Sequence, residues 1–311
     1  MKKKKGQLQI SFAWIFAIVV GAFILFLAIY VTTRVAETGG ELSTVKTAKE
    51  ISVLINPLET GVETGEVVLL EMPVETRIYN NCTLEGTFGK QVIKMSQKSF
   101  NAWTETDLVT QIPNKYIFSG NYEQGKDFII FAKPFEFPFK VSDLIYILSE
   151  ERKYCFLDPP ARITSELRDL NKSNLFTAES SCPGNSIEVC FGNSGCDINV
   201  VETRKSVDKK SSNGTQTVFY ETDALMYAAI FSDKNVYECQ IKRLMQRTET
   251  LAKLYEEKRQ LISRQTCSDN INLQLLESSA GFAKDSRDLA SVGEVSEEVN
   301  AQNDFATCRL W

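Results

Sequence analysis

The chain contains no histidine among its 311 residues. Histidine is the side chain used most often for proton transfer near neutral pH, and it is the commonest metal ligand. Its absence excludes catalytic triads that need a histidine base and most zinc sites. Among hydrolases, only those built from carboxylates stay open as a hypothesis.

Several short enzyme motifs are also missing. No Cys-x-x-Cys occurs, which argues against a thioredoxin-like redox centre. Residues 192–195 lack the spacing of a nucleophile elbow, and residues 86–90 are too short for a phosphate loop. Asp158, Glu166 and Asp169 are acidic, but no pattern brings two of them together. We therefore predict that the chain is not an enzyme and has neither a metal site nor a cofactor.

Negative charge exceeds positive charge outside the N-terminus. Residues 1–39 hold five positive charges against one negative, and the whole chain carries a net charge of -5. The remaining 30 positive and 39 negative charges give residues 40–311 a net charge of -9. Such a surface repels phosphates, so we predict that nucleic acid is not a partner.

A long apolar stretch near the N-terminus lacks charge altogether. Residues 6–33 contain no charged side chain, and residues 10–31 are almost wholly apolar apart from Ser11. A helix needs about 20 such residues to cross a bilayer. We predict a basic cytosolic leader at residues 1–9 and a transmembrane helix at residues 10–33.

The flanking charges predict the orientation of this helix. Four consecutive lysines precede the stretch, and Arg34 alone follows it, which favours a cytosolic N-terminus and an extracytosolic C-terminal domain in a single-pass cell-membrane protein. A cleaved secretory signal has a shorter apolar region that ends in small residues, whereas this stretch ends in Tyr30 and Val31 before two threonines.

The residues at the start of the stretch resemble a known signal. A lysine and Gly6 precede Gln-Leu-Gln-Ile-Ser-Phe-Ala-Trp-Ile-Phe, which is similar to the class III signal of archaeal type IV pilin-like proteins. The resemblance implies that a prepilin peptidase cuts between Gly6 and Gln7 and leaves the helix on the mature chain. It also implies identical or pilin-like subunits as partners beside the lipid bilayer. The family's usual glutamate near the fifth mature position is replaced by Ser11, or by Ala13 in a second alignment, so processing is favoured over polymerisation.

Residues 34–62 connect the membrane segment to the exported part. Apolar residues recur there at helical spacing, which predicts a juxtamembrane helix. The glycines at positions 39 and 40 favour instead a short separate helix after a flexible joint. Both alternatives stay open.

Residues 63–232 predict a disulfide-braced, mainly antiparallel β domain. Short β-branched or aromatic runs begin at positions 67, 92, 116 and 128, separated by glycine, asparagine and proline. We also expect a helix at 161–170, strands at 187–190 and 198–201, and a polar loop at 204–214.

One stretch of this domain alternates with a period of two. Apolar residues recur between positions 129 and 141, and the prolines at 134 and 138 confine the segment to a sheet edge or an extended conformation. Such an aromatic row can stack on sugar rings, and it forms a candidate binding face: Phe131, Phe135, Phe137 and Phe139. Alternatively, the same row is the core-facing side of a strand.

The tail, residues 233–311, changes to a helical pattern. Apolar residues follow a three-four alternation over residues 236–265, and a second helical segment covers about residues 271–305. A polar turn near position 269 separates them, so we predict an antiparallel helical hairpin.

All of the cysteines follow the apolar stretch, and their even number predicts up to four disulfides in an oxidising location. In the predicted hairpin, Cys239 and Cys308 come to the same end, so we predict that these two bond. The full set is Cys82, Cys155, Cys182, Cys190, Cys196, Cys239, Cys267 and Cys308.

Together these patterns predict an α+β protein with a single N-terminal transmembrane helix, a mainly antiparallel β ectodomain and a C-terminal antiparallel helical hairpin. The favoured function is a membrane-anchored, non-catalytic cell-surface protein of pilin-like type, with a structural or adhesive role. One alternative is a solitary anchored receptor that binds a carbohydrate or a protein. Another is an exported carboxylate-based hydrolase.

Overall fold

The computed structural model describes residues 14–32, 67–99, 102–177, 181–192, 195–212, 214–263, 267 and 270–311. The chain divides into two units, Met1–Thr47 and Ala48–Trp311. In the smaller unit the described part is one helix, Trp14–Thr32. The predicted leader, the cleavage residues Gly6 and Gln7 and the segment at 34–62 lie outside the described residues.

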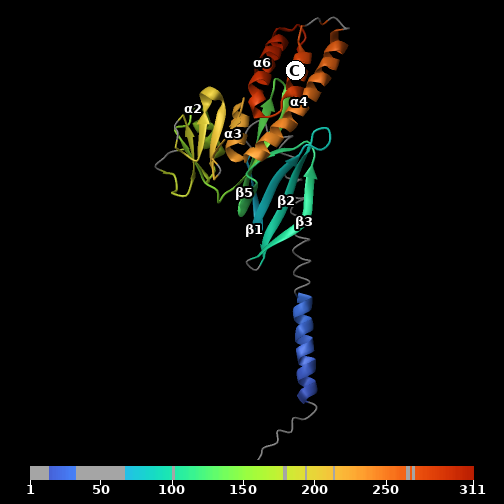
Figure 1. Ribbon diagram of the computed structural model, residues 1–311, viewed down its shortest axis with the longest axis vertical. Helices are drawn as coiled ribbons and strands as arrows, with labels where there is room; N and C mark the ends of the chain where they lie inside the picture. The colour runs from blue at the N-terminus through green and yellow to red at the C-terminus, as the bar shows by residue number, and fades with distance from the viewer. Residues whose placement is uncertain are drawn as a thin grey trace, which may run out of the picture. The chain divides into compact units, whose positions relative to one another are not determined.

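The larger unit is α+β and contains two six-stranded sheets (Figure 1). The first has the order β3-β2-β1-β5-β6-β4 and is antiparallel except where β4 runs parallel to β6. Each of the four predicted β runs lies within one of its strands. The strands are β1 (Val67–Thr83), β2 (Lys90–Ser99), β3 (Ala102–Ile112), β4 (Tyr116–Phe118), β5 (Tyr122–Glu136) and β6 (Lys140–Ser149).

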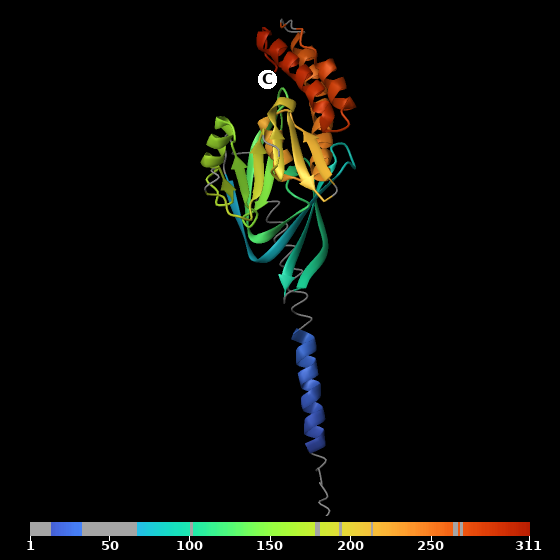
Figure 2. The same cartoon turned by 60° about the vertical axis from the view of Figure 1, so that its left-hand side comes forward.

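The second sheet has the order β12-β11-β10-β9-β7-β8, and its strands are seen beside the tail helices in Figure 2. Its strands β10, β9, β7 and β8 are parallel neighbours, so the prediction of a mainly antiparallel domain is wrong for this half. Parallel strands need crossover connections, and helix α2 (Ala161–Leu170), at its predicted position, supplies one between β7 and β8. The strands are β7 (Tyr154–Leu157), β8 (Leu175–Phe176), β9 (Ile187–Phe191), β10 (Ile198–Val201), β11 (Ser206–Ser211) and β12 (Gly214–Phe219).

The predicted polar loop at 204–214 is wrong, because most of it is strand β11. The backbone of β11 pairs with β10 on one side and with β12 on the other. These ladders satisfy the backbone while the side chains of Lys210 and Ser211 stay exposed, so polar composition did not prevent a strand here.

Helix α3 (Asp223–Phe231) joins the two sheets. It contacts β5 and β6 of the first sheet and β11 and β12 of the second, and every residue from Ala224 to Phe231 is buried. The hydroxyl of Tyr146, on β6, donates to the backbone oxygen of Ala224 at 2.7 Å. Outside a membrane, an α-helix that is apolar on all sides is stable in such an interior position. The larger hydrophobic core therefore runs from the first sheet through α3 to the second sheet and the tail helices.

The described tail holds three helices where two were predicted: α4 (Lys234–Ser263), α5 (Leu273–Phe282) and α6 (Leu289–Phe305). The expected second helix is interrupted after α5, where the side chain of Asp285 caps the short 3-10 helix Ser286–Asp288. Helix α5 packs against α4, and α6 packs against α5.

All of the cysteines are paired in four disulfides, but not as predicted: Cys82–Cys239, Cys155–Cys182, Cys190–Cys196 and Cys267–Cys308. The predicted Cys239–Cys308 bond is wrong because the tail has a third helix. With α6 reversing the direction of α5, the chain ends near the C-terminal end of α4, where Cys267 lies, while the start of α4 meets the end of β1.

Candidate functional site

The predicted binding face lies inside the core. Phe131, Phe135, Phe137 and Phe139 expose between 0% and 4% of their surface, so no sugar ring can stack on them. The ring of Phe139, for example, stacks on Tyr255 of α4 with 4.5 Å between the centroids. The other interpretation, that this row faces the core, is therefore correct.

A surface pocket of about 630 Å³ lies beside this core, among β5, α2 and the start of α3. Its apolar wall includes Ala132, Ala224 and Leu170. The polar residues that line it come from all three elements: Lys133 and Glu136 from β5, Glu166 and Asp169 from α2, and Asp223 and Tyr227 from α3. The volume falls within the range of roughly 300–1,000 Å³ that is typical of small-molecule sites.

Two of the four carboxylates that line the pocket are neutralised by neighbouring cations. Lys133 Nζ lies 2.8 Å from Glu166 Oε2, and Arg162 Nε lies 2.9 Å from Asp223 Oδ2. The same arginine also bonds Glu202, 2.6 Å away, and these carboxylates raise the pKa of Arg162. The site therefore contains ion pairs that hold β5 to α2 and α2 to α3.

The other two carboxylates, those of Glu136 and Asp169, are exposed. Within the described part of the chain, neither forms an ion pair. With two paired and two unpaired carboxylates, the pocket carries a net negative charge.

Tyr227 forms a buried wall of the pocket and exposes 1% of its surface. Lys133 Nζ lies 5.0 Å from the centroid of its ring, within the range of a cation–π contact. Burial, with the nearby Glu166 carboxylate as the second cause, raises the pKa of Tyr227. Its hydroxyl makes no hydrogen bond of normal geometry with the described residues. A buried hydroxyl in this state costs free energy unless another group satisfies it.

Glu166 and Asp169, three residues apart on α2, both line the pocket, whereas Asp158 does not. Lys133, Asp223 and Tyr227 had no local signal, because the pocket combines three elements that are distant in sequence. No cluster of three or more histidine, cysteine, aspartate or glutamate side chains that could hold a metal occurs among the described residues.

No protein-family model matches this chain, and no curated protein or solved structure is significantly similar to it.

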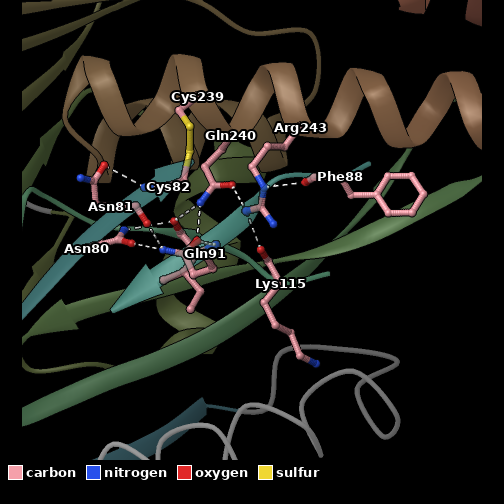
Figure 3. Close-up of a disulfide and its surroundings, with 10 residues drawn as sticks. Asn80, Asn81, Cys82, Phe88, Gln91, Lys115, Cys239, Gln240 and Arg243 are labelled. Atoms are coloured by element: carbon pink, nitrogen blue, oxygen red, sulfur yellow. Dashed lines mark hydrogen bonds between the residues drawn. A yellow bond between two sulfur atoms is a disulfide. The ribbon is translucent and has the colours of Figure 1, made fainter. Parts of the chain in front are cut away.

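A second polar assembly lies beneath the Cys82–Cys239 disulfide, in the larger unit (Figure 3). Gln91 Nε2 donates to the side-chain oxygen of Asn80, and Gln240 Nε2 donates to Gln91 Oε1. We call the assembly the buried amide cluster, and its members are Asn80, Gln91, Gln240 and Arg243. It connects β1 and β2 to α4 near the point where the disulfide joins β1 to α4.

Arg243 is the charged member of the cluster and is fully buried. It donates to the backbone oxygens of Phe88 and Lys115 at 2.9 and 2.8 Å, and to Gln240 Oε1 at 2.7 Å. Its guanidinium carbon lies 4.7 Å from the ring centroid of Tyr116. Burial lowers the pKa of Arg243 to about 10. This arginine ties α4 to two backbone segments, which is a structural task.

The helix of the smaller unit has the properties of a membrane anchor or a signal sequence. Trp14–Thr32 has 19 residues, is strongly apolar, and is not buried against protein. Length and composition therefore allow it to cross a bilayer.

Proposed function

We propose that this protein is a membrane-anchored, non-catalytic cell-surface protein of pilin-like type, with a structural or adhesive role. The observation that carries the proposal is the combination of an exposed apolar helix, Trp14–Thr32, with a separate unit that holds four disulfides. Disulfides persist in oxidising compartments, which favours export of the larger unit.

The orientation rests on charge. Four lysines lie before the helix and Arg34 lies after it, which favours a cytosolic N-terminus. Protease added to whole cells should therefore digest the cysteine-bearing unit and leave the N-terminal helix in the membrane. Protection of that unit in intact cells, or its release without the helix, would contradict the proposal.

The pilin-like part rests on the lysine, Gly6 and Gln7 that precede the apolar stretch. In a host with prepilin peptidase, the mature chain should start at Gln7. Gly6→Val should block the cut and leave the leader in place. Gly21→Val is the matched control, because a side chain added at Gly21 meets no atom within 4 Å. Intact-mass measurement of the membrane fraction shows where each chain starts in the unmodified protein, in Gly6→Val and in Gly21→Val. An intact Met1 in the unmodified protein would exclude cleavage by prepilin peptidase.

A solitary anchored receptor is the second candidate. The phenylalanine row cannot be its binding face, because these side chains are buried. The pocket beside β5 favours a receptor instead, because it offers a surface site for a ligand. Filament subunits would pack their apolar helices against one another, whereas a receptor would leave the helix in lipid. Electron microscopy of sheared surface fractions separates the two: filaments containing this chain support the structural role, and their absence with the chain retained in membranes supports the receptor.

A further inference from the structure

We propose that the pocket among β5, α2 and α3 binds an organic cation, namely a primary ammonium group carried on a short aliphatic chain. This inference concerns the larger unit and does not depend on processing or polymerisation of the anchored protein. It rests on the pocket's size, on its charge and on a buried hydroxyl that makes no hydrogen bond of normal geometry with the described residues.

The residues that line the pocket form an apolar region and an acidic region. Ala132, Ala224 and Leu170 provide an apolar wall for methylene groups. The carboxylates of Glu136 and Asp169 provide acceptors for a charged end. A ligand with an aliphatic body and a charged ammonium group matches both regions, because the methylene groups would pack on the apolar wall and the ammonium group would lie near the carboxylates.

The charges favour a cation over an anion. Lys133, which lines the pocket, is already engaged by Glu166 at 2.8 Å and by the ring of Tyr227. The unpaired carboxylates of Glu136 and Asp169 would repel an anion. The net charge of -9 on residues 40–311 adds a weaker long-range attraction for cations.

The start of α3 does not reverse this preference. A helix N-terminus attracts anions through its free backbone amides. In α3, however, the side chain of Thr222 accepts from the amide of Leu225 at 3.3 Å, and Asp223 places a carboxylate in the first turn. An anion would meet these oxygens first.

Tyr227 is an independent sign of a ligand. Its side chain is almost completely buried, it lines the pocket, and its hydroxyl has no hydrogen bond of normal geometry within the described part. Glu166, whose carboxylate contributes to the raised pKa of Tyr227, lines the same pocket. An ammonium group is a donor in three directions, so it can bond the tyrosine oxygen and the carboxylates together.

Isothermal titration calorimetry on the full chain in a non-ionic detergent tests the proposal. The probes are spermidine, N-acetyl-lysinamide, glucose as a neutral ligand and glutarate as an anion. We expect heat of binding from at least one of the two amines, no binding of glutarate or glucose, and weaker amine binding at higher salt. Stronger binding of spermidine would indicate a free polyamine, and stronger binding of N-acetyl-lysinamide would indicate a lysine side chain of a partner.

Variants locate the binding. Glu136→Gln with Asp169→Asn should weaken amine binding about tenfold, given roughly threefold for each exposed charge pair. Tyr227→Phe keeps the ring and should weaken binding about threefold without loss of thermal stability, since only an unsatisfied hydroxyl is removed.

The matched control is Glu257→Gln with Glu294→Gln, which removes the same charge from exposed positions on α4 and α6. It should change amine binding less than twofold. The proposal is overturned if neither amine binds, if both double variants weaken binding equally, or if glucose binds as tightly as the amines.

Discussion

Removing the Cys82–Cys239 disulfide should destabilise the protein more than removing Cys190–Cys196. In the chain-entropy account, a crosslink restricts the unfolded chain, and the effect grows with the length of the closed loop. The loops differ greatly, with sequence separations of 157 and 6 residues. The corresponding contributions to the free energy of unfolding are about 5 and about 2 kcal/mol.

Other bridges change this difference little. Cys155–Cys182 and Cys190–Cys196 lie inside the long loop and shorten its effective length. Because the entropy depends on the logarithm of loop length, this lowers its contribution by only about 0.2 kcal/mol. The buried amide cluster still connects β1 and β2 to α4 when the disulfide is absent, so we expect the variant to fold.

The assay is urea unfolding of the full chain in micelles under oxidising conditions, followed by tryptophan fluorescence. Trp311 reports on the core because its ring lies 5.4 Å from that of Phe139. The Cys82→Ala/Cys239→Ala chain should unfold about 1 M urea earlier than the Cys190→Ala/Cys196→Ala chain, for a slope of about 3 kcal/mol per M. Equal midpoints, or an earlier midpoint for the short-loop variant, would refute the reasoning.

Three further changes test the core and its buried charges by the same urea assay. Phe135→Ala should lower the free energy of unfolding by about 4 kcal/mol, as expected for a buried phenylalanine, whereas Phe305→Ala at a side chain that is 92% exposed should change it by less than about 0.5 kcal/mol. Arg243→Met should cost about 3 kcal/mol, because three acceptors, two of them buried, lose their donor; an unchanged midpoint would mean that relief of the buried charge offsets this loss. Burial raises the pKa of Glu123 above 4.5 despite its 2.9 Å pair with Arg152. The folded state therefore binds more protons at this carboxyl than the unfolded state does. As pH rises from 4.5 toward neutrality, the urea midpoint of the wild-type chain should fall relative to that of Glu123→Gln. A rise over that range would show that the donors to Glu123 outweigh its burial.

Local pattern determined several elements of the structure. The uncharged stretch around Trp14–Thr32 predicts an apolar helix, because composition alone decides whether a segment can lie in a bilayer. Helix α2 has its predicted bounds, since two prolines mark its start. Pro134 lies in an extended strand, as one of its two alternatives predicted, but that strand, β5, lies between β1 and β6, so the alternative of a sheet edge is wrong.

Other elements depended on packing. The apolar run at 224–231 has no period that separates a buried helix from a buried strand, and contact with both sheets made it α3. In the tail, Asp285 caps a short turn, so a third helix forms and Cys308 meets Cys267 instead of Cys239.

The candidate pocket shows most clearly that local sequence patterns do not reveal contacts between distant segments. Glu136, Glu166 and Tyr227 belong to a strand and two helices that are separated by long stretches of sequence. Sequence by itself determined that this protein has an apolar helix followed by a cysteine-rich α+β unit, because periodicity and composition are local properties. Only the tertiary structure decided which cysteines bond, which phenylalanines are hidden and which carboxylates share a cavity, because these depend on contacts between distant segments.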